Sequence, residues 1–251
     1  MSLVVVILIV AGSALLAAVV GGRIGRRLQT RLGDQERFQL FGVQASLLGL
    51  LALLLGFSFA MGQTRYDVRR RLVVDEANAI ATSRLRALAV PEPTGSELRV
   101  LLDAYVESRL IIVRARGERD VGAAIAESER LQREIWSRAA SLAKADPRSI
   151  PVGLLLQSLN EMIDLHTSRL GAARNHIPST VLAVLTLVAI AAMGWVGASF
   201  GSVGRRGTAT TLILSALIAL VVAMIVDLDQ PRSGIVRVSQ LPLVEIQRSF
   251  P

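Results

Sequence analysis

Four long runs of apolar residues limit what this chain can fold into more than any other feature of its sequence. None of the runs contains a charged residue, and they cover about residues 3–21, 38–61, 178–201 and 208–226. A helix of about 20 residues spans the roughly 30 Å hydrocarbon core of a bilayer. With 52% hydrophobic and only 19% charged residues, the chain is too apolar for a water-soluble domain. The sequence predicts an all-α protein that crosses a lipid bilayer four times.

The first run has an alternative interpretation, as a cleaved signal peptide. A signal peptide carries basic residues before its apolar run. Here no charged residue precedes Leu3, and the nearest arginines, Arg23, Arg26 and Arg27, follow the run. This order favours a retained transmembrane helix.

Composition and motifs argue against several classes of chemistry. The chain has no cysteine, which excludes disulfides, thiolate metal ligands and cysteine nucleophiles. No phosphate-binding glycine loop, nucleophile elbow or zinc-protease motif occurs. His166 and His176 lie about 280° apart around a helix, so they share no face for a metal ion. We therefore expect no enzymatic activity, no cofactor and no metal site.

The net charge of +8 comes almost entirely from arginine, since Lys144 is the only lysine. Anionic lipid headgroups attract such residues to the membrane surface. A nucleic-acid-binding protein would carry a compact basic patch interleaved with aromatic residues, and this sequence has none. The lipid bilayer is therefore an expected partner, and nucleic acid is not.

A polar insert, residues 62–176, separates the second and third runs, and its pattern is helical throughout. Apolar residues recur at intervals of three and four over residues 98–117, about 120–144, and from Pro151 to Pro178. Ser96 followed by Glu97 is typical of a helix start. The predicted parts are transmembrane helices in 1–61, a helical cytosolic domain in 62–176, transmembrane helices in 177–227, and a C-terminal tail in 228–251 that packs on that domain.

The second run passes into charged sequence without a break. No proline lies between Phe38 and about Val90, and the helical period of apolar residues continues through Ile80 and Leu85. We expect one helix of about 50 residues, about 75 Å long, with half of it beyond the bilayer. The three insert helices would cover its apolar stripe there.

Glycines recur every seven residues along one face of this helix. The face consists of Gly42, Ser46, Gly49, Leu53, Gly56 and Ala60. Small residues let helices approach closely, so one interpretation is a packing seam within the helix bundle, formed by Gly42, Gly56 and Ala60. The other is that part of the face looks onto the axis of an oligomer, because lipid would penalise the polar Gln44 and Ser46.

Two polar groups later in the chain leave alternatives open. Asn160 and Asp164 share a helix face and could join Glu161 and Arg169 in a polar network, or they lie on a solvated face. Asp227 and Asp229 directly follow the fourth run. These two carboxylates could serve acid–base chemistry or bind a cation, or they cap a helix end and pair with arginine.

Two stretches of the sequence resemble bestrophins. In GLLALLLGFSFAMGQTRYDVRRRLVVDEANAIATSRLRAL, residues 49–88, a Gly-Phe pair is followed after seven residues by an arginine and an aromatic residue, then by a polar helix. DLDQPRSGIVRVSQLPLVEIQRSF, residues 227–250, is similar to the bestrophin segment after the fourth span, where a Leu-Pro-Leu triplet opens a final helix. With four spans and a helical insert, the resemblance covers most of the chain and is nearest to divergent bacterial members.

The resemblance implies a pentameric ion channel whose second helices line a hydrophobic neck. Matched at the Gly-Phe pair, the neck positions are Phe57, Leu53 and Gly49. Hydrophobic constrictions gate pores by dewetting, and the glycine implies a neck that is wider at its level. The same match places the junction with the cytosolic domain at Arg65, Tyr66 and Asp67.

Three departures from the bestrophin pattern limit what the resemblance implies. Asp67 replaces a second aromatic residue after the arginine, and Arg232 replaces a phenylalanine after the proline. The acidic calcium-binding run of animal bestrophins is absent, so calcium gating is not expected.

The two guides to membrane orientation disagree. The arginines of the first loop, with Arg205 and Arg206 in the last, would place both loops in the cytoplasm. The resemblance instead places the termini and the insert there, and because arginines flank both ends in similar number we follow the resemblance. The hypothesis is a ring-shaped homo-oligomer, a pentamer by resemblance, in a bacterial inner membrane that conducts small inorganic ions. The alternative is a non-conducting scaffold or sensor whose helical insert binds a partner.

Overall fold

The computed structural model describes residues 3–114, 117–205, 207–230 and 234–249, and every regular element among them is helical. In chain order, the elements are α1 Leu3–Leu28, α2 Asp34–Arg86, η1 Ala87–Ala89, α3 Thr94–Arg114, α4 Glu118–Ala145, α5 Ile150–Arg174, α6 Ser179–Ser202, α7 Thr208–Asp229 and α8 Leu241–Ser249. Four of the helical stretches are long and apolar enough to cross a membrane, and they contain the four predicted runs. The predicted all-α class and the four candidate spans are confirmed.

The predicted long helix is also confirmed, as the 53-residue α2. It begins at Asp34, four residues before the expected Phe38, because Gly33 and Glu36 form a start signal there. The Glu36 carboxylate accepts the Gly33 N–H at 2.9 Å, which satisfies a backbone donor at the helix start. The helix then continues through the charged sequence without a break, since its first following proline is Pro91.

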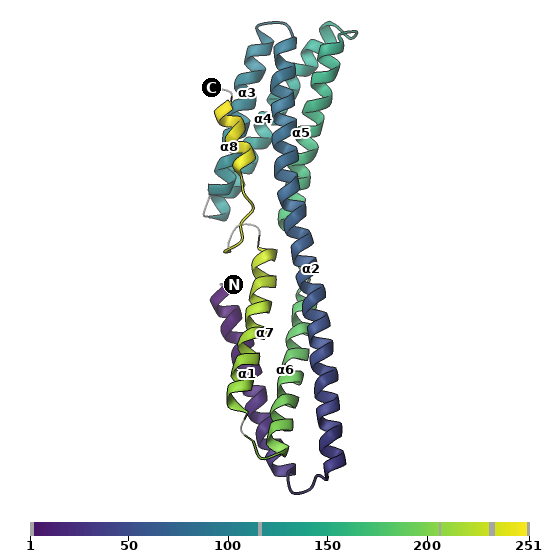
Figure 1. Ribbon diagram of the computed structural model, residues 1–251. Coiled ribbons are helices and arrows are strands. Elements are labelled where there is room, and N and C mark those ends of the chain that lie inside the picture. The colour runs from purple at the N-terminus through teal and green to yellow at the C-terminus, as the bar shows by residue number, and fades with distance from the viewer. Residues whose placement is uncertain (1–2, 115–116, 206, 231–233, 250–251) are drawn as a thin grey trace. The chain divides into compact units, whose positions relative to one another are not determined.

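The chain divides into two compact units (Figure 1), and we call them the span unit and the insert unit. The span unit comprises Met1–Tyr66 and His176–Arg237, and the insert unit comprises Asp67–Asn175 and Val238–Pro251. The first boundary therefore lies between Tyr66 and Asp67 rather than after residue 61. Helix α2 belongs to both units.

Helices α1 and α6 pack closely in the span unit through glycines on both sides. A Cβ built on Gly21 would lie 1.8 Å from the carbonyl oxygen of Gly194, and one built on Gly197 would lie 1.9 Å from that of Ala18. No side chain fits such gaps, so the two backbones are in direct contact. This is the close approach that small residues spaced by four allow in membrane helices. We call this contact the α1–α6 seam.

The insert unit has its own apolar core, formed by α3, α4, α5, α8 and the second part of α2. Leu98, Leu102 and Tyr105 of α3 are completely buried there. Helix α3 begins at Thr94, before the Ser96 expected to cap it. The carboxylate of Glu92 accepts the Ser96 N–H at 2.8 Å, so Glu92 takes the capping role that we had assigned to Ser96.

The C-terminal tail contributes to the same core. Leu243 of α8 is fully buried among residues of the insert unit, and α8 contacts α3. Gln240, just before α8, accepts a hydrogen bond from Arg169 at 3.0 Å. Three features of the sequence lie outside the described residues: Arg206, which was counted for membrane orientation, Arg232, which departs from the bestrophin pattern, and residue 250 at the end of the resembling segment.

Candidate functional site

The apolar stretch of α2 is the candidate span that its own chain covers least. Only 6% of its most apolar window is buried, against 28% to 33% in the other three candidate spans. The buried positions Leu51 and Ser58 lie seven residues apart, on one side of the helix. The opposite side of α2 is exposed.

The three predicted neck positions lie together on this exposed side. Leu53 follows the buried Leu51 by two residues, or about 200° around the helix axis, and Phe57 lies about one turn further on. The exposed fractions are 54% for Leu53 and 65% for Phe57. A Cβ on Gly49, one turn earlier, would meet nothing within 4 Å. We call Gly49, Leu53 and Phe57 the neck face.

The glycine face of α2 does not pack within the described part of this chain. A Cβ on Gly42 or Gly56 would meet nothing within 4 Å, and Ala60 is exposed. The close helix contact within the span unit is instead the α1–α6 seam, which the sequence analysis did not identify. The other interpretation, in which part of this face looks onto the axis of an oligomer, stays a prediction.

The two polar residues of the span lie on different sides of α2. Ser46 is exposed, near the neck face, and its hydroxyl donates to the Gly42 carbonyl at 3.1 Å. This bond within the helix lowers the cost of the hydroxyl in an apolar environment. Gln44 is half-buried on the packing side, and its Oε1 has no hydrogen-bond partner among the described residues. Only Ser46 therefore accompanies the neck face.

The predicted junction residues lie at the boundary between the two units. The Arg65 Nη1 is 3.9 Å from the Asp229 Oδ1 at the end of α7, and Tyr66 and Asp67 are half-buried. Asp229 also accepts the Ile177 N–H at 3.0 Å. This arrangement favours the interpretation of Asp229 as part of an arginine-paired helix end.

Asp227 anchors the chain that follows α7. It is 4% exposed, and its two oxygens accept the N–H groups of Ile235 and Val236, each at 2.9 Å. A Cβ on Gly234 would lie 2.5 Å from Asp227 Oδ1, so a larger residue there would have to displace this carboxylate. Backbone donors thus occupy the Asp227 carboxylate. No group of three metal-ligating side chains occurs among the described residues.

Arg69 has a structural role in the insert unit that the sequence did not reveal. Its side chain is 6% exposed and donates to the carbonyls of Ala172 at 3.0 Å and Asn175 at 2.9 Å. These carbonyls lie at the C-terminal end of α5, where a cation is favoured by the helix dipole. One turn after Arg65, α2 therefore supplies a cap for the end of another helix.

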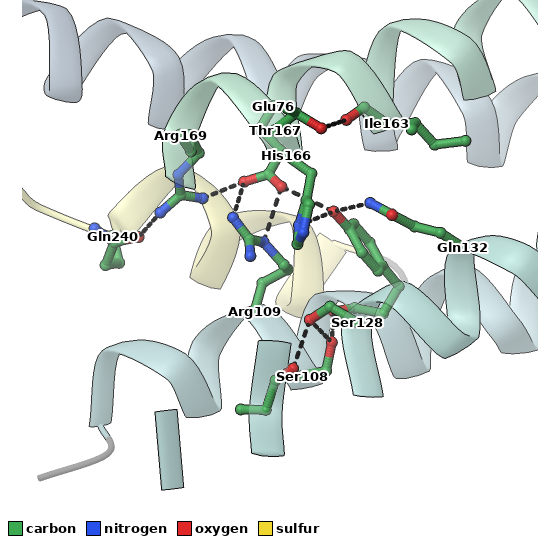
Figure 2. Close-up of polar contacts among 12 residues, drawn as sticks. Glu76, Ser108, Arg109, Ser128, Gln132, Ile163, His166, Thr167, Arg169 and Gln240 are labelled. Atoms are coloured by element: carbon green, nitrogen blue, oxygen red, sulfur yellow. Dashed lines mark hydrogen bonds and ion pairs between the residues drawn. The ribbon is translucent and has the colours of Figure 1, made fainter. Parts of the chain in front are cut away.

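A buried ionic network ties together four segments of the insert unit (Figure 2). At its centre is Glu76 of α2, which is completely buried. Arg109 of α3 lies 2.8 Å from its carboxylate, and Arg169 of α5 donates to the same carboxylate. Tyr105 donates to it at 2.9 Å, and Arg169 also donates to Gln240 of the tail.

The charges in this network set the protonation of its members. Burial by itself raises the pKa of Glu76, but the charges of Arg169 and Arg109 outweigh it and hold the pKa below its usual value. Burial, together with the charges of Arg109 and Arg169, lowers the pKa of His166 from 6.5 to about 4, although the charge of Glu76 acts in the opposite direction. We infer a carboxylate at Glu76 and a neutral imidazole at His166 near neutral pH.

The network differs from the one considered in the sequence analysis. Asn160 donates to Asp164 at 3.0 Å on an exposed face, which matches the solvated alternative. Arg169, on the same helix, instead reaches Glu76, which is 93 residues earlier in the chain. Local spacing on α5 cannot reveal such a partner.

An all-helical chain with four candidate spans and a second, charged helical unit has the fold of an integral membrane protein. A family model of the Bestrophin-like domain matches residues 7–243. The chain therefore belongs to the bestrophin-like family, which confirms the resemblance seen in the sequence.

Solved structures share this fold. A bacterial bestrophin homologue from Klebsiella pneumoniae is 16% identical, with a TM-score of 0.68 over 99% of this chain and 96% of that chain. A variant of a bacterial bestrophin homologue from the same organism is 15% identical, with a TM-score of 0.71 over 100% and 98% of the two chains. At these identities the likeness establishes the fold alone. No curated protein sequence matches the chain.

Proposed function

We propose that this protein is the subunit of a homo-oligomeric ion channel, with α2 lining the pore and Phe57, Leu53 and Gly49 facing the lumen. The proposal includes a pentameric ring in a bacterial inner membrane, with the insert unit in the cytosol. The bestrophin-like family membership supports it. Small inorganic ions would be the substrates, and no enzymatic step is required.

The observation that carries the proposal is the uncovered neck face of α2. The helix packs on its own chain through the side of Leu51 and Ser58, which leaves Leu53 and Phe57 exposed on the other side. Gly42 and Gly56 lie on the same side, and a Cβ on either would meet nothing within 4 Å, so the described part of the chain leaves this whole side of α2 uncovered. A ring of subunits would enclose this surface around a central axis.

The neck would act through dehydration. An ion that passes a ring of phenylalanine or leucine side chains loses water, and these side chains offer no hydrogen bonds in exchange. Such a ring opens or closes by wetting and dewetting of the constriction. Because Gly49 has no side chain, the pore would be wider at its level, one helical turn before Leu53 in the chain.

Ion flux in reconstituted vesicles tests the proposal. Purified protein in liposomes is expected to pass chloride or sodium faster than protein-free vesicles do. Absence of flux for both ions, from protein whose oligomer is intact by native mass measurement, would favour the alternative, a non-conducting scaffold or sensor whose insert unit binds a partner.

A further inference from the structure

A cleft of about 900 Å³ lies between α4 and α5 of the insert unit. Its volume lies in the range of known small-molecule sites, about 300 to 1,000 Å³. The cleft is open where Gly171 on α5 lacks a side chain, since a Cβ there would meet nothing within 4 Å. Its floor includes His166, which is 3% exposed, and Gln132, which donates to Tyr105 of the buried network at 3.1 Å.

The walls of the cleft combine a flat apolar surface with positive charge. Trp136 of α4 is 38% exposed, and it lines the cleft together with Ile163 and Leu170 of α5. Arg133 and Arg174 also line it. Neither arginine has an ion-pair partner among the described residues, whereas Arg130 and Arg138 on α4 do.

The charge of the lining selects the ligand. The described residues that line the cleft include two arginines and one carboxylate, that of Glu129, so the lining carries a net positive charge. A planar guanidinium binds a carboxylate in a forked geometry, and it is less strongly hydrated than a lysine ammonium. An aromatic ring would lie against the apolar wall, where Trp136 offers a stacking partner.

We propose that this cleft binds a small organic anion, in particular an aromatic carboxylate. The ring would contact Trp136 and Leu170, and the carboxylate would reach Arg133 or Arg174 at the edge. The site lies within the insert unit, and it does not depend on whether the protein conducts ions.

The test uses isothermal titration of the full-length protein in detergent with 2-naphthoate. Its uncharged counterpart, 2-naphthamide, has the same rings and measures the contribution of the charge. Gly171→Leu fills the cleft, and Gly153→Leu adds the same side chain to α5 at another open position outside the cleft. Because both variants replace a helical glycine, both are expected to melt no lower than the wild-type protein.

The proposal predicts saturable binding of 2-naphthoate at one site per chain. Gly171→Leu should weaken that binding at least tenfold, Gly153→Leu should leave it unchanged, and 2-naphthamide should bind at least tenfold more weakly. Equal binding by Gly171→Leu and wild-type protein would overturn the site, and equal binding of amide and carboxylate would overturn its selectivity for anions. If the wild-type protein binds neither probe and Gly171→Leu alters the oligomer mass, the cleft is a subunit interface and the proposal is wrong.

Discussion

Glu76 is the residue on which the polar core of the insert unit depends. Its carboxylate contacts Arg109, Arg169 and Tyr105 from a position without solvent exposure. Replacing an entire buried ion network by apolar residues is often harmless, but removal of one partner leaves charges buried without compensation. The stability of the insert unit therefore depends strongly on the residue at position 76.

Glu76→Gln should destabilise the insert unit strongly. The substitution keeps the size of the side chain but leaves two buried guanidiniums without a counter-charge, which costs about 3–5 kcal/mol. Chemical denaturation followed by circular dichroism measures the change. Glu127→Gln is the control, because Glu127 pairs with Arg130 on an exposed face of α4, and its midpoint should not shift measurably. Equal effects of the two substitutions would contradict the role assigned to the network.

His166 gives the insert unit a defined sensitivity to acid. Its pKa is about 4 in the folded protein and 6.5 in the unfolded chain, so the unfolded chain binds more protons between these values. Arg109 and Arg169 disfavour the protonated ring, while Glu76 favours it. Stability is therefore fully present above about pH 6.5 and falls as the pH decreases toward 4. Because the pKa of Glu76 is lowered from 4.5, protonation of this carboxylate destabilises the folded protein further only below about pH 4.5.

His166→Gln should remove the part of the acid sensitivity that lies between pH 6.5 and 4. We expect the melting temperature of the wild-type protein to fall across this range and that of the variant to change less. Thermal unfolding in detergent at several pH values measures both proteins, and His176 is retained in each. Parallel pH profiles for the two proteins would show that another group causes the acid sensitivity.

At the scale of the elements, the α1–α6 seam is the tightest contact of the span unit. We expect Gly197→Ala to separate the two helices, because its Cβ would lie 1.9 Å from the Ala18 carbonyl oxygen. Overpacking of this kind typically costs about 1–3 kcal/mol. Gly12→Ala on α1 is the control, since a Cβ there meets nothing within 4 Å. Melting temperatures in detergent should fall for the first variant only; unchanged stability of Gly197→Ala would contradict the seam.

Sequence patterns predicted the helices well because hydropathy and proline positions act locally. The long α2 followed from the absence of proline before Pro91, and the four spans followed from their apolar runs. Contacts between helices were not predicted in the same way. Glycine spacing suggested a packing seam on α2, yet the close contact in this chain uses Gly21 and Gly197 of α1 and α6. The spacing of glycines shows that a helix has a face of small residues, but it does not show which helix packs against that face.

The candidate site was predicted only in part, for a related reason. The neck positions share a face because their spacing of four residues fixes it. The partners of Glu76 could not be predicted, because Arg109 and Arg169 reach it from other helices, 33 and 93 residues later. The capping role of Arg69 likewise depends on how α5 ends beside α2 within the insert unit.

At the scale of the whole molecule, the proposed channel requires several copies of the chain. One copy leaves the neck face of α2 exposed, and a pore needs that face to be closed into a ring. The effect of replacing Phe57 by alanine distinguishes a position that faces the lumen from one that is packed between helices. A buried phenylalanine replaced by alanine typically costs about 3–5 kcal/mol and would damage assembly, whereas one that faces a lumen would not.

The most direct test of the channel is the ion flux of Phe57→Ala and of the double variant with Leu53→Ala in reconstituted liposomes. Both substitutions shorten side chains that would strip water from a passing ion. We predict that flux rises in Phe57→Ala and rises further in the double variant, with the oligomer mass unchanged by native mass measurement. Lower stability with no gain in flux would assign Phe57 to helix packing and contradict a pore lined by α2.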